Sequence, residues 1–169
     1  CTVLDHDAEM IEAARSFGYR VFYGDATRLD LLRTAGAANA RILVLAVDDV
    51  DQSLEIVDLV QAHFPHLRIV ARAHDVTHWN KLRDRGIMKV EREMFESSLL
   101  SARSVLEMLG RSAEEALQIT TRFRQHNLEL FEKLHPHYRD QAKLISVIKE
   151  GRAQLEEQMA QERAEQANR

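Results

Sequence analysis

Short apolar runs alternate with amphipathic segments along the first half of the chain. Runs rich in β-branched and aromatic residues occur at residues 2–4, 19–24, 41–47, 68–71 and 88–90. Between them, hydrophobic residues recur at helical spacing. Strands that alternate with helices over short connections are typical of parallel pairing with right-handed crossovers. The pattern therefore predicts an α/β fold with a Rossmann-like, doubly wound parallel sheet.

Local patterns refine this prediction. Residues 41–47 are almost continuously apolar, which predicts a strand covered on both faces. Thr27, with Asp30 three residues later, resembles a capping box and predicts a helix start at Thr27. Gly18 and Gly36 stand where helices are expected to end.

After Glu93 the hydrophobic period is entirely helical. Ser112 and Glu115 form a second capping-box pattern, and the helix that follows is predicted to continue to about His135. Apolar and small residues on it recur at alternating spacings of four and three, which is typical of a helix packed along another helix, often from a second chain. This seam consists of Ala116, Thr120, Phe123, Asn127, Leu130 and Leu134.

A last helix is predicted from Asp140, with its apolar pattern fading after Leu155 into a solvated or frayed tail. We predict two parts: a partial Rossmann-like nucleotide-binding domain at residues 1–94, and a helical arm for dimerisation at residues 95–169.

Residues 19–30 read as strand, turn and helix, the arrangement in which α/β proteins bind ligands at the carboxyl ends of strands. Asp5, at the end of the first run, stands where an acidic residue accepts hydrogen bonds from ribose hydroxyls. Alternatively, Asp5 or Asp7 caps the next helix. No G-x-G-x-x-G loop is present. We expect the first strand and this loop to lie upstream of Cys1, so that the chain holds the ribose and base edge of the site.

Composition excludes several other classes of function. The net charge is −4, and the 23 basic residues are scattered among 27 acidic ones, which argues against nucleic-acid binding. None of the eight histidines forms a ligand pair at i, i+4 spacing with a supporting general base, and there is one cysteine, so no metal site is predicted. No nucleophile elbow is found, and we predict no enzymatic activity.

Three residues have two interpretations each. Asn127 either fixes the register of the helical seam or offers its amide to a peptide-like ligand. Arg92 either forms a local ion pair within Glu-Arg-Glu or captures a carboxylate with its planar fork. Phe17 is expected in the core rather than at a ligand.

Together, five stretches resemble the cytoplasmic C-terminal domain of Kef-type, glutathione-gated potassium efflux systems, a potassium-transport nucleotide-binding regulatory domain. They are residues 3–7 (Val-Leu-Asp-His-Asp), 17–27, 63–67 (His-Phe-Pro-His-Leu), 71–73 (Ala-Arg-Ala) and 91–95 (Glu-Arg-Glu-Met-Phe). The similarity weakens beyond about Gln141.

The resemblance implies a bound nucleotide, AMP or NAD(H), with a structural or regulatory role. Asp5, Asp25 and Ala26 then resemble the ribose and adenine contacts, and we add Thr27 and Asp48, which stand at the same predicted edge.

The resemblance also implies control of potassium/proton antiport by glutathione, which inhibits, and by glutathione S-conjugates, which activate. Arg92 and Asn127 then resemble the glutathione contacts, and Phe17 resembles the residue that senses bulk on the ligand sulfur. We add Asp75, at a strand–helix junction, to this set.

The implied partners are a second copy bound through the helical arm, the transmembrane domain of the same polypeptide, and a quinone-reductase-like ancillary subunit. The implied location is the cytoplasmic face of the bacterial inner membrane. Two alternatives remain open: a nucleotide-binding regulatory domain of another potassium channel or uptake system, and part of an NAD-dependent oxidoreductase.

Overall fold

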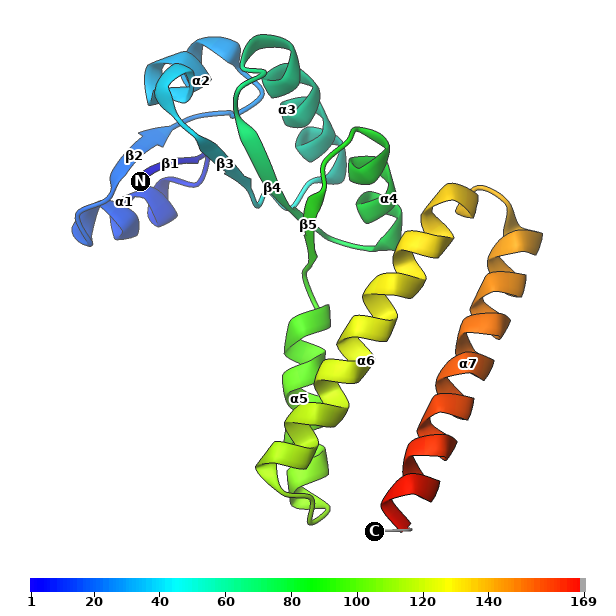
Figure 1. The fold of residues 1–169 in the computed structure, drawn as a ribbon. Coiled ribbons are helices and arrows are strands. Elements are labelled where there is room, and N and C mark those ends of the chain that lie inside the picture. The colour runs from blue at the N-terminus through cyan, green and yellow to red at the C-terminus, as the bar shows by residue number, and fades with distance from the viewer. Residues whose placement is uncertain (168–169) are drawn as a thin grey trace. The chain divides into compact units, whose positions relative to one another are not determined.

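A computed structural model describes residues 1–167 of the chain (Figure 1). The chain divides into two compact units, Cys1–Glu93 and Met94–Arg169. The first is an α/β unit and the second is wholly helical.

All strand pairs in the first unit are parallel, but they form two separate sheets. β1 pairs with β2, whereas β4 lies between β3 and β5 (Figure 1). The elements in chain order are β1 Thr2–Asp5, α1 Ala8–Ser16, β2 Arg20–Tyr23, α2 Leu29–Ala35, η1 Ala37–Asn39, β3 Ile42–Leu45, α3 Val50–His63, β4 Arg68–Ala73, α4 Val76–Asp84 and β5 Lys89–Arg92.

The two sheets follow a doubly wound order from which the central strand is missing. Reading across gives β2, β1, then β3, β4, β5 (Figure 1). The usual order 3-2-1-4-5-6 becomes this one when its first strand is left out. Within the described residues, the free edges of β1 and β3 have no strand partner. The split therefore agrees with the predicted lack of a first strand.

β3 differs from its prediction. It was expected to be covered on both faces, yet Ile42 and Val44 are 52% and 69% exposed, while Leu45 is buried. The physical reason is that β3 pairs with β4 along one edge only and no described element covers the face that carries Ile42 and Val44. The expectation of burial on both faces was wrong for the chain as described.

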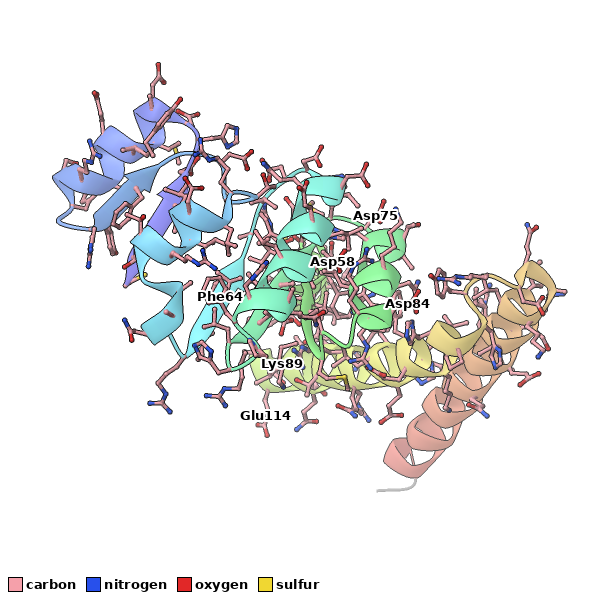
Figure 2. All side chains as sticks on the ribbon, turned by 90° about the horizontal axis from the view of Figure 1, so that it is seen from above. Asp58, Phe64, Asp75, Asp84, Lys89 and Glu114 are labelled. Atoms are coloured by element: carbon pink, nitrogen blue, oxygen red, sulfur yellow. The ribbon has the colours of Figure 1, made fainter. Side chains whose placement is uncertain are left out.

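The core of this unit lies between α3, α4 and the three-stranded sheet. Ile56, Val57 and Val60 of α3 are fully buried. Small residues on β4, Ala71 and Ala73, allow α4 to pack closely on the sheet. Other buried apolar residues of this core are Phe64, which follows α3 (Figure 2), Leu67, Ile69, Trp79, Leu82 and Ile87. Each fully buried aliphatic side chain contributes about 1.5–3 kcal/mol to stability.

The start of α2 also differs from its prediction. The helix begins at Leu29, and its N-cap Arg28 makes no side-chain capping bond. Instead, the Thr27 N–H donates to Asp25 Oδ1 at 2.8 Å, and Asp30 pairs with Arg28. The capping box predicted from Thr27 and Asp30 was wrong, because the Asp25 carboxylate binds the Thr27 amide and holds this residue in a turn.

The second unit consists of α5 Phe95–Met108, α6 Ala113–Leu134, η2 His135–His137 and α7 Gln141–Ala167. The capping box of Ser112 and Glu115 is present, as predicted. α6 packs against both α5 and α7, and Arg124 of α6 pairs with Glu96 of α5. α7 continues past Leu155, where the apolar pattern fades. No helix in the described part of the chain is long and apolar enough to span a membrane.

Candidate ligand-binding edge

Polar residues stand at the carboxyl end of every strand in the first unit. Asp5 ends β1, Asp25 follows β2, Asp48 follows β3, Asp75 follows β4 and Glu93 follows β5. The carboxyl ends of parallel strands face the same side of a sheet, which is where open α/β folds bind ligands. The predicted nucleotide residues Asp5, Asp25 and Asp48 thus all lie at the carboxyl ends of strands. Asp5 and Asp25 belong to the β1–β2 sheet, and Asp48 belongs to the β3–β4–β5 sheet.

The two carboxylates of the β1–β2 sheet, those of Asp5 and Asp25, accept hydrogen bonds within local turns. Asp5 Oδ1 accepts the Asp7 N–H at 2.9 Å, and it is Asp7 that caps α1. Asp25 Oδ1 accepts the Thr27 N–H and, at 3.2 Å, the side-chain amide of Gln52. The backbone bond from Thr27 is the main cause that lowers the pKa of Asp25. Both carboxylates accept these bonds through Oδ1, and a carboxylate has a second oxygen that can accept from a hydroxyl group.

Gln52 belongs to the first turn of α3, so its bond to Asp25 links the turn after β2 to the helix after β3. This contact crosses the split between the two sheets.

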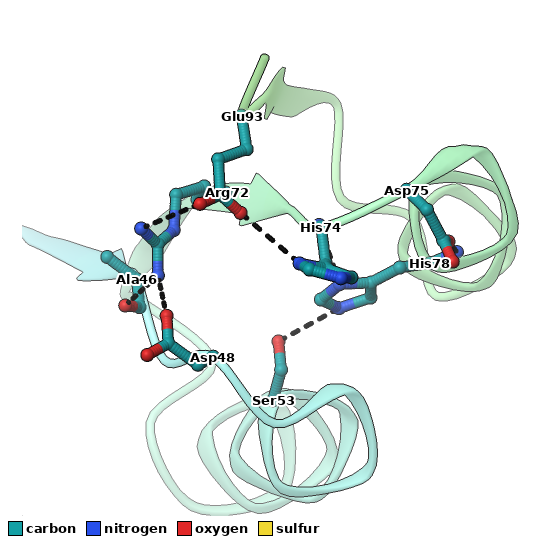
Figure 3. A network of polar contacts seen from close by, with 8 residues as sticks. All are labelled: Ala46, Asp48, Ser53, Arg72, His74, Asp75, His78 and Glu93. Atoms are coloured by element: carbon teal, nitrogen blue, oxygen red, sulfur yellow. Dashed lines mark hydrogen bonds and ion pairs between the residues drawn. The ribbon is translucent and has the colours of Figure 1, made fainter.

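Arg72 of β4 connects the ends of all three strands of the larger sheet (Figure 3). Its Nη2 donates to the Ala46 carbonyl at 2.8 Å and to Asp48 Oδ1, both just beyond β3. Its Nη1 lies 3.7 Å from Glu93 Oε1, just beyond β5. Planar guanidinium groups are suited to serving several acceptors in fixed directions. Sequence reasoning missed this role, because the partners lie on other strands and depend on strand order.

Two histidines continue the network into the helices (Figure 3). His74 Nδ1 lies 3.3 Å from Glu93 Oε2. The backbone N–H of His74 donates to His78 Nδ1 at 3.2 Å, so the neutral His78 ring carries its proton on Nε2, which faces Ser53 Oγ at 3.1 Å. His78 and Ser53 are almost fully buried. Burial lowers the pKa of His78.

The predicted glutathione residues are distributed over both units. Arg92 ends β5, half-buried, and pairs in register with Ala73. Asp75 is the N-cap of α4, and its Oδ1 accepts the His78 N–H at 2.7 Å. Asn127 lies on α6 and is half-buried. The first unit thus brings Arg92 and Asp75 to one edge.

Phe17 differs from its expected place in the core. It is the C-cap of α1 and is 79% exposed. Because α1 begins at the carboxyl end of β1, its last residue lies toward the amino end of β2, away from Asp5 and Asp25. The expectation of a core position was wrong, since no described element packs over this helix end.

No cluster of three potential metal ligands exists among the residues that the structure describes.

Comparison with known proteins agrees with this geometry. Residues 1–93 match the TrkA-N domain family, and residues 97–169 match the potassium efflux system KefB C-terminal domain. The fold aligns with a Kef C-terminal domain of Shewanella denitrificans in its AMP-bound form, with a TM-score of 0.70 and 32% identity over 80% of this chain and 96% of that one. The chain belongs to the Kef family of C-terminal domains. The expected resemblance and the Rossmann-like fold class are thereby confirmed.

Kef relatives extend the comparison. The glutathione-regulated potassium-efflux system proteins KefC of Salmonella arizonae and Escherichia coli O139:H28 are each 45% identical over 161 residues, which is 95% of this chain and 26% of the relative. The chain therefore spans about a quarter of the length of these relatives. The TrkA-N domain of the E. coli inner membrane protein ybaL aligns with a TM-score of 0.54 and 26% identity, over 64% of this chain and 77% of that one.

Proposed function

We propose that this Kef domain regulates potassium efflux by binding a nucleotide and glutathione. The observation that carries the proposal is the row of carboxylates after β1, β2 and β3, in a chain that aligns over 96% of an AMP-bound Kef domain. Glutathione holds the transporter closed, and glutathione S-conjugates release it. The domain performs no reaction of its own.

AMP or NAD(H) is the proposed nucleotide. The Asp5 carboxylate accepts the ribose hydroxyls, and the turn of Asp25, Ala26 and Thr27 faces the adenine. The residues fit this half of a nucleotide, because Asp5 and Asp25 each use one oxygen in a local turn and retain the other. Asp48 faces the same ligand from β3. The nucleotide supplies hydroxyl and amino donors and a phosphate, and its role is structural or regulatory.

Glutathione offers two carboxylates and two peptide groups, for which an arginine fork and an asparagine amide are suitable partners. Arg92 binds a carboxylate and Asn127 binds a peptide group, with Asp75 near the ammonium group. Phe17 meets the sulfur substituent. Phe17 lies at the opposite end of α1 from the nucleotide edge. In the proposed homodimer, the contact with this ligand therefore comes from Phe17 of the other chain.

The partners follow the same proposal. The domain forms a homodimer through the helical arm, is joined to a transmembrane domain at the cytoplasmic face of the inner membrane, and binds a quinone-reductase-like ancillary subunit.

Thermal stabilisation of the 169-residue chain by glutathione tests the function. A ligand that binds the native state raises its apparent stability by mass action, so millimolar glutathione should raise the melting temperature. Arg92→Met should remove this rise, because it deletes the fork while keeping a side chain of similar length. Arg68→Met, at the amino end of the neighbouring strand β4, is the matched control and should behave as the unaltered chain.

Stabilisation by AMP without any effect of glutathione would favour a regulator of another potassium channel or uptake system. Turnover of NADH with an electrophile would favour the oxidoreductase. Either outcome would overturn the proposal.

A further inference from the structure

Arg72 lies between two sets of residues to which different ligands are assigned. On one side it bonds Asp48, at the nucleotide edge, and on the other it pairs with Glu93, the residue after Arg92. The Asp48 side chain is 93% exposed, so that a ligand can reach the carboxylate that Arg72 bonds. Arg72 and Glu93 are each one-third exposed.

Glu93 is tied to β4 twice. Its N–H donates to the Ala73 carbonyl at 3.1 Å, and its carboxylate faces both Arg72 and His74. Since Ala73 is also the register partner of Arg92, these contacts fix the position of the strand end that carries Arg92.

We propose that Arg72 is a positioning residue that couples nucleotide binding at Asp48 to glutathione binding at Arg92. The inference rests on the proposed function. It adds an energetic coupling between the two ligand sites, which binding at either site alone does not require.

The coupling follows from competition for one carboxylate. A hydroxyl or amino group of the nucleotide that bonds Asp48 takes a share of the acceptor that Arg72 uses. Exposed ion pairs are individually weak, so the exchange of partners costs little. The guanidinium then moves closer to Glu93, from which Nη1 is now 3.7 Å away, and holds the end of β5 more firmly. A more rigid Arg92 binds glutathione more tightly, and the effect is reciprocal.

Calorimetric titration with glutathione, with and without saturating AMP, measures this coupling. In the unaltered chain, AMP should raise the glutathione affinity about fivefold or more, the range of ordinary allosteric coupling. In Arg72→Leu the ratio of the two affinities should fall to about one. Arg72→Lys should give an intermediate ratio, because an ammonium group keeps the charge but lacks the fork.

Arg85→Leu is the matched control. Arg85 also makes a two-nitrogen contact with a carboxylate, that of Asp58, but this contact joins the C-cap of α4 to the middle of α3, away from the strand ends that Asp48 and Glu93 follow. The affinity ratio in this variant should equal that of the unaltered chain. If Arg72→Leu only damaged the structure, it would weaken the binding of both ligands without changing the ratio of the glutathione affinities with and without AMP.

Amide hydrogen exchange at Glu93 provides a second readout that needs no ligand. Exchange should be faster in Arg72→Leu than in the unaltered chain and unchanged in Arg85→Leu. An unchanged affinity ratio in Arg72→Leu, an unchanged Glu93 exchange rate, or no effect of AMP on glutathione in the unaltered chain would each overturn the role of Arg72. Failure of the unaltered chain to bind either ligand would instead defeat the proposed function, and the coupling with it.

Discussion

At the scale of single residues, His78 shows how burial and hydrogen bonding select one protonation state. Its Nδ1 accepts the His74 N–H, and its Nε2 faces the buried Ser53 hydroxyl. Burial lowers the pKa of His78, and nearby Asp75 opposes this shift only in part, with His74 and Lys81 adding to it. Protonation would require Nδ1 to give up its backbone donor, so the folded state favours the neutral ring.

Stability should consequently fall in mildly acidic solution. The folded pKa of His78 is below the ordinary value of 6.5, so the unfolded chain binds more protons between these two values. The contribution of His78 is fully present above about pH 6.5 and is lost as the pH falls toward the folded pKa. Urea unfolding at pH 7.5, 6.5 and 5.5 should show this loss. His78→Gln, whose amide can replace both hydrogen bonds, should reduce the slope, and an identical slope in this variant would contradict the assignment.

Gly24 illustrates a backbone requirement at the turn after β2. Its φ is +146°, and an added Cβ would lie 2.8 Å from Leu31 Cδ2. Gly24→Ala should therefore reduce the free energy of unfolding by about 1–3 kcal/mol, through strain together with crowding of Leu31. Gly36→Ala is a useful comparison, because Gly36 also has a positive φ but nothing lies within 4 Å of the added methyl. Thermal denaturation should show the larger loss of stability for Gly24→Ala. Equal losses in the two variants would show that crowding of Leu31 does not contribute.

At the scale of elements, the start of α6 depends on a reciprocal cap. The Ser112 hydroxyl accepts the Glu115 N–H, and the Glu115 carboxylate accepts the Ser112 N–H at 3.0 Å. This backbone bond is the main cause that lowers the pKa of Glu115.

Ser112→Ala should lower the free energy of unfolding by about 1 kcal/mol, because an N-cap acceptor is lost. Ser104→Ala, within α5, should change it little, since that hydroxyl only bonds the carbonyl four residues earlier. Chemical denaturation of the two variants measures the difference. A loss at Ser104 as large as at Ser112 would show that the cap is not the cause.

The two capping patterns also mark how far sequence reasoning extends. Ser112 and Thr27 both precede an acidic residue at the right spacing, yet only Ser112 caps a helix. The difference is Asp25, whose carboxylate binds the Thr27 amide first. Such competition depends on turn geometry, which the spacing alone does not contain.

The candidate site divides in the same way. The positions of Asp5, Asp25 and Asp48 at strand ends could be predicted because each directly follows an apolar run of the sequence. The Arg72 network could not, because Ala46, Asp48 and Glu93 become neighbours of Arg72 only through the pairing of β3, β4 and β5. The exposed position of Phe17 was missed because an aromatic residue at a helix end gives the same pattern whether or not another element covers it.

At the scale of the whole molecule, α5 offers apolar surface for the proposed homodimer. None of the α5 side chains is fully buried, and Val105, Met108 and Leu109 are exposed apolar residues. Met108→Glu should raise the dimer dissociation constant about tenfold or more, because an unpaired charge would be desolvated.

Sedimentation equilibrium measures this change. Thr77→Glu adds the same charge on α4, outside the arm, and should leave the dissociation constant unchanged. A chain that is monomeric without substitution would contradict dimerisation through the arm.

The split between the β1–β2 sheet and the β3–β4–β5 sheet has a consequence for cooperativity. Parts of a protein that share few hydrogen bonds can open separately, each with its own free energy. β4, paired on both edges, belongs to the tighter part, whereas β1 and β2 pair as strands only with each other, and the Gln52–Asp25 bond is a contact between the parts. A nucleotide that bonds Asp5 and Asp25 in one part and Asp48 in the other would join them into one unfolding unit. The bound ligand would thus hold the two sheets together, and its loss would first cause local opening around β1.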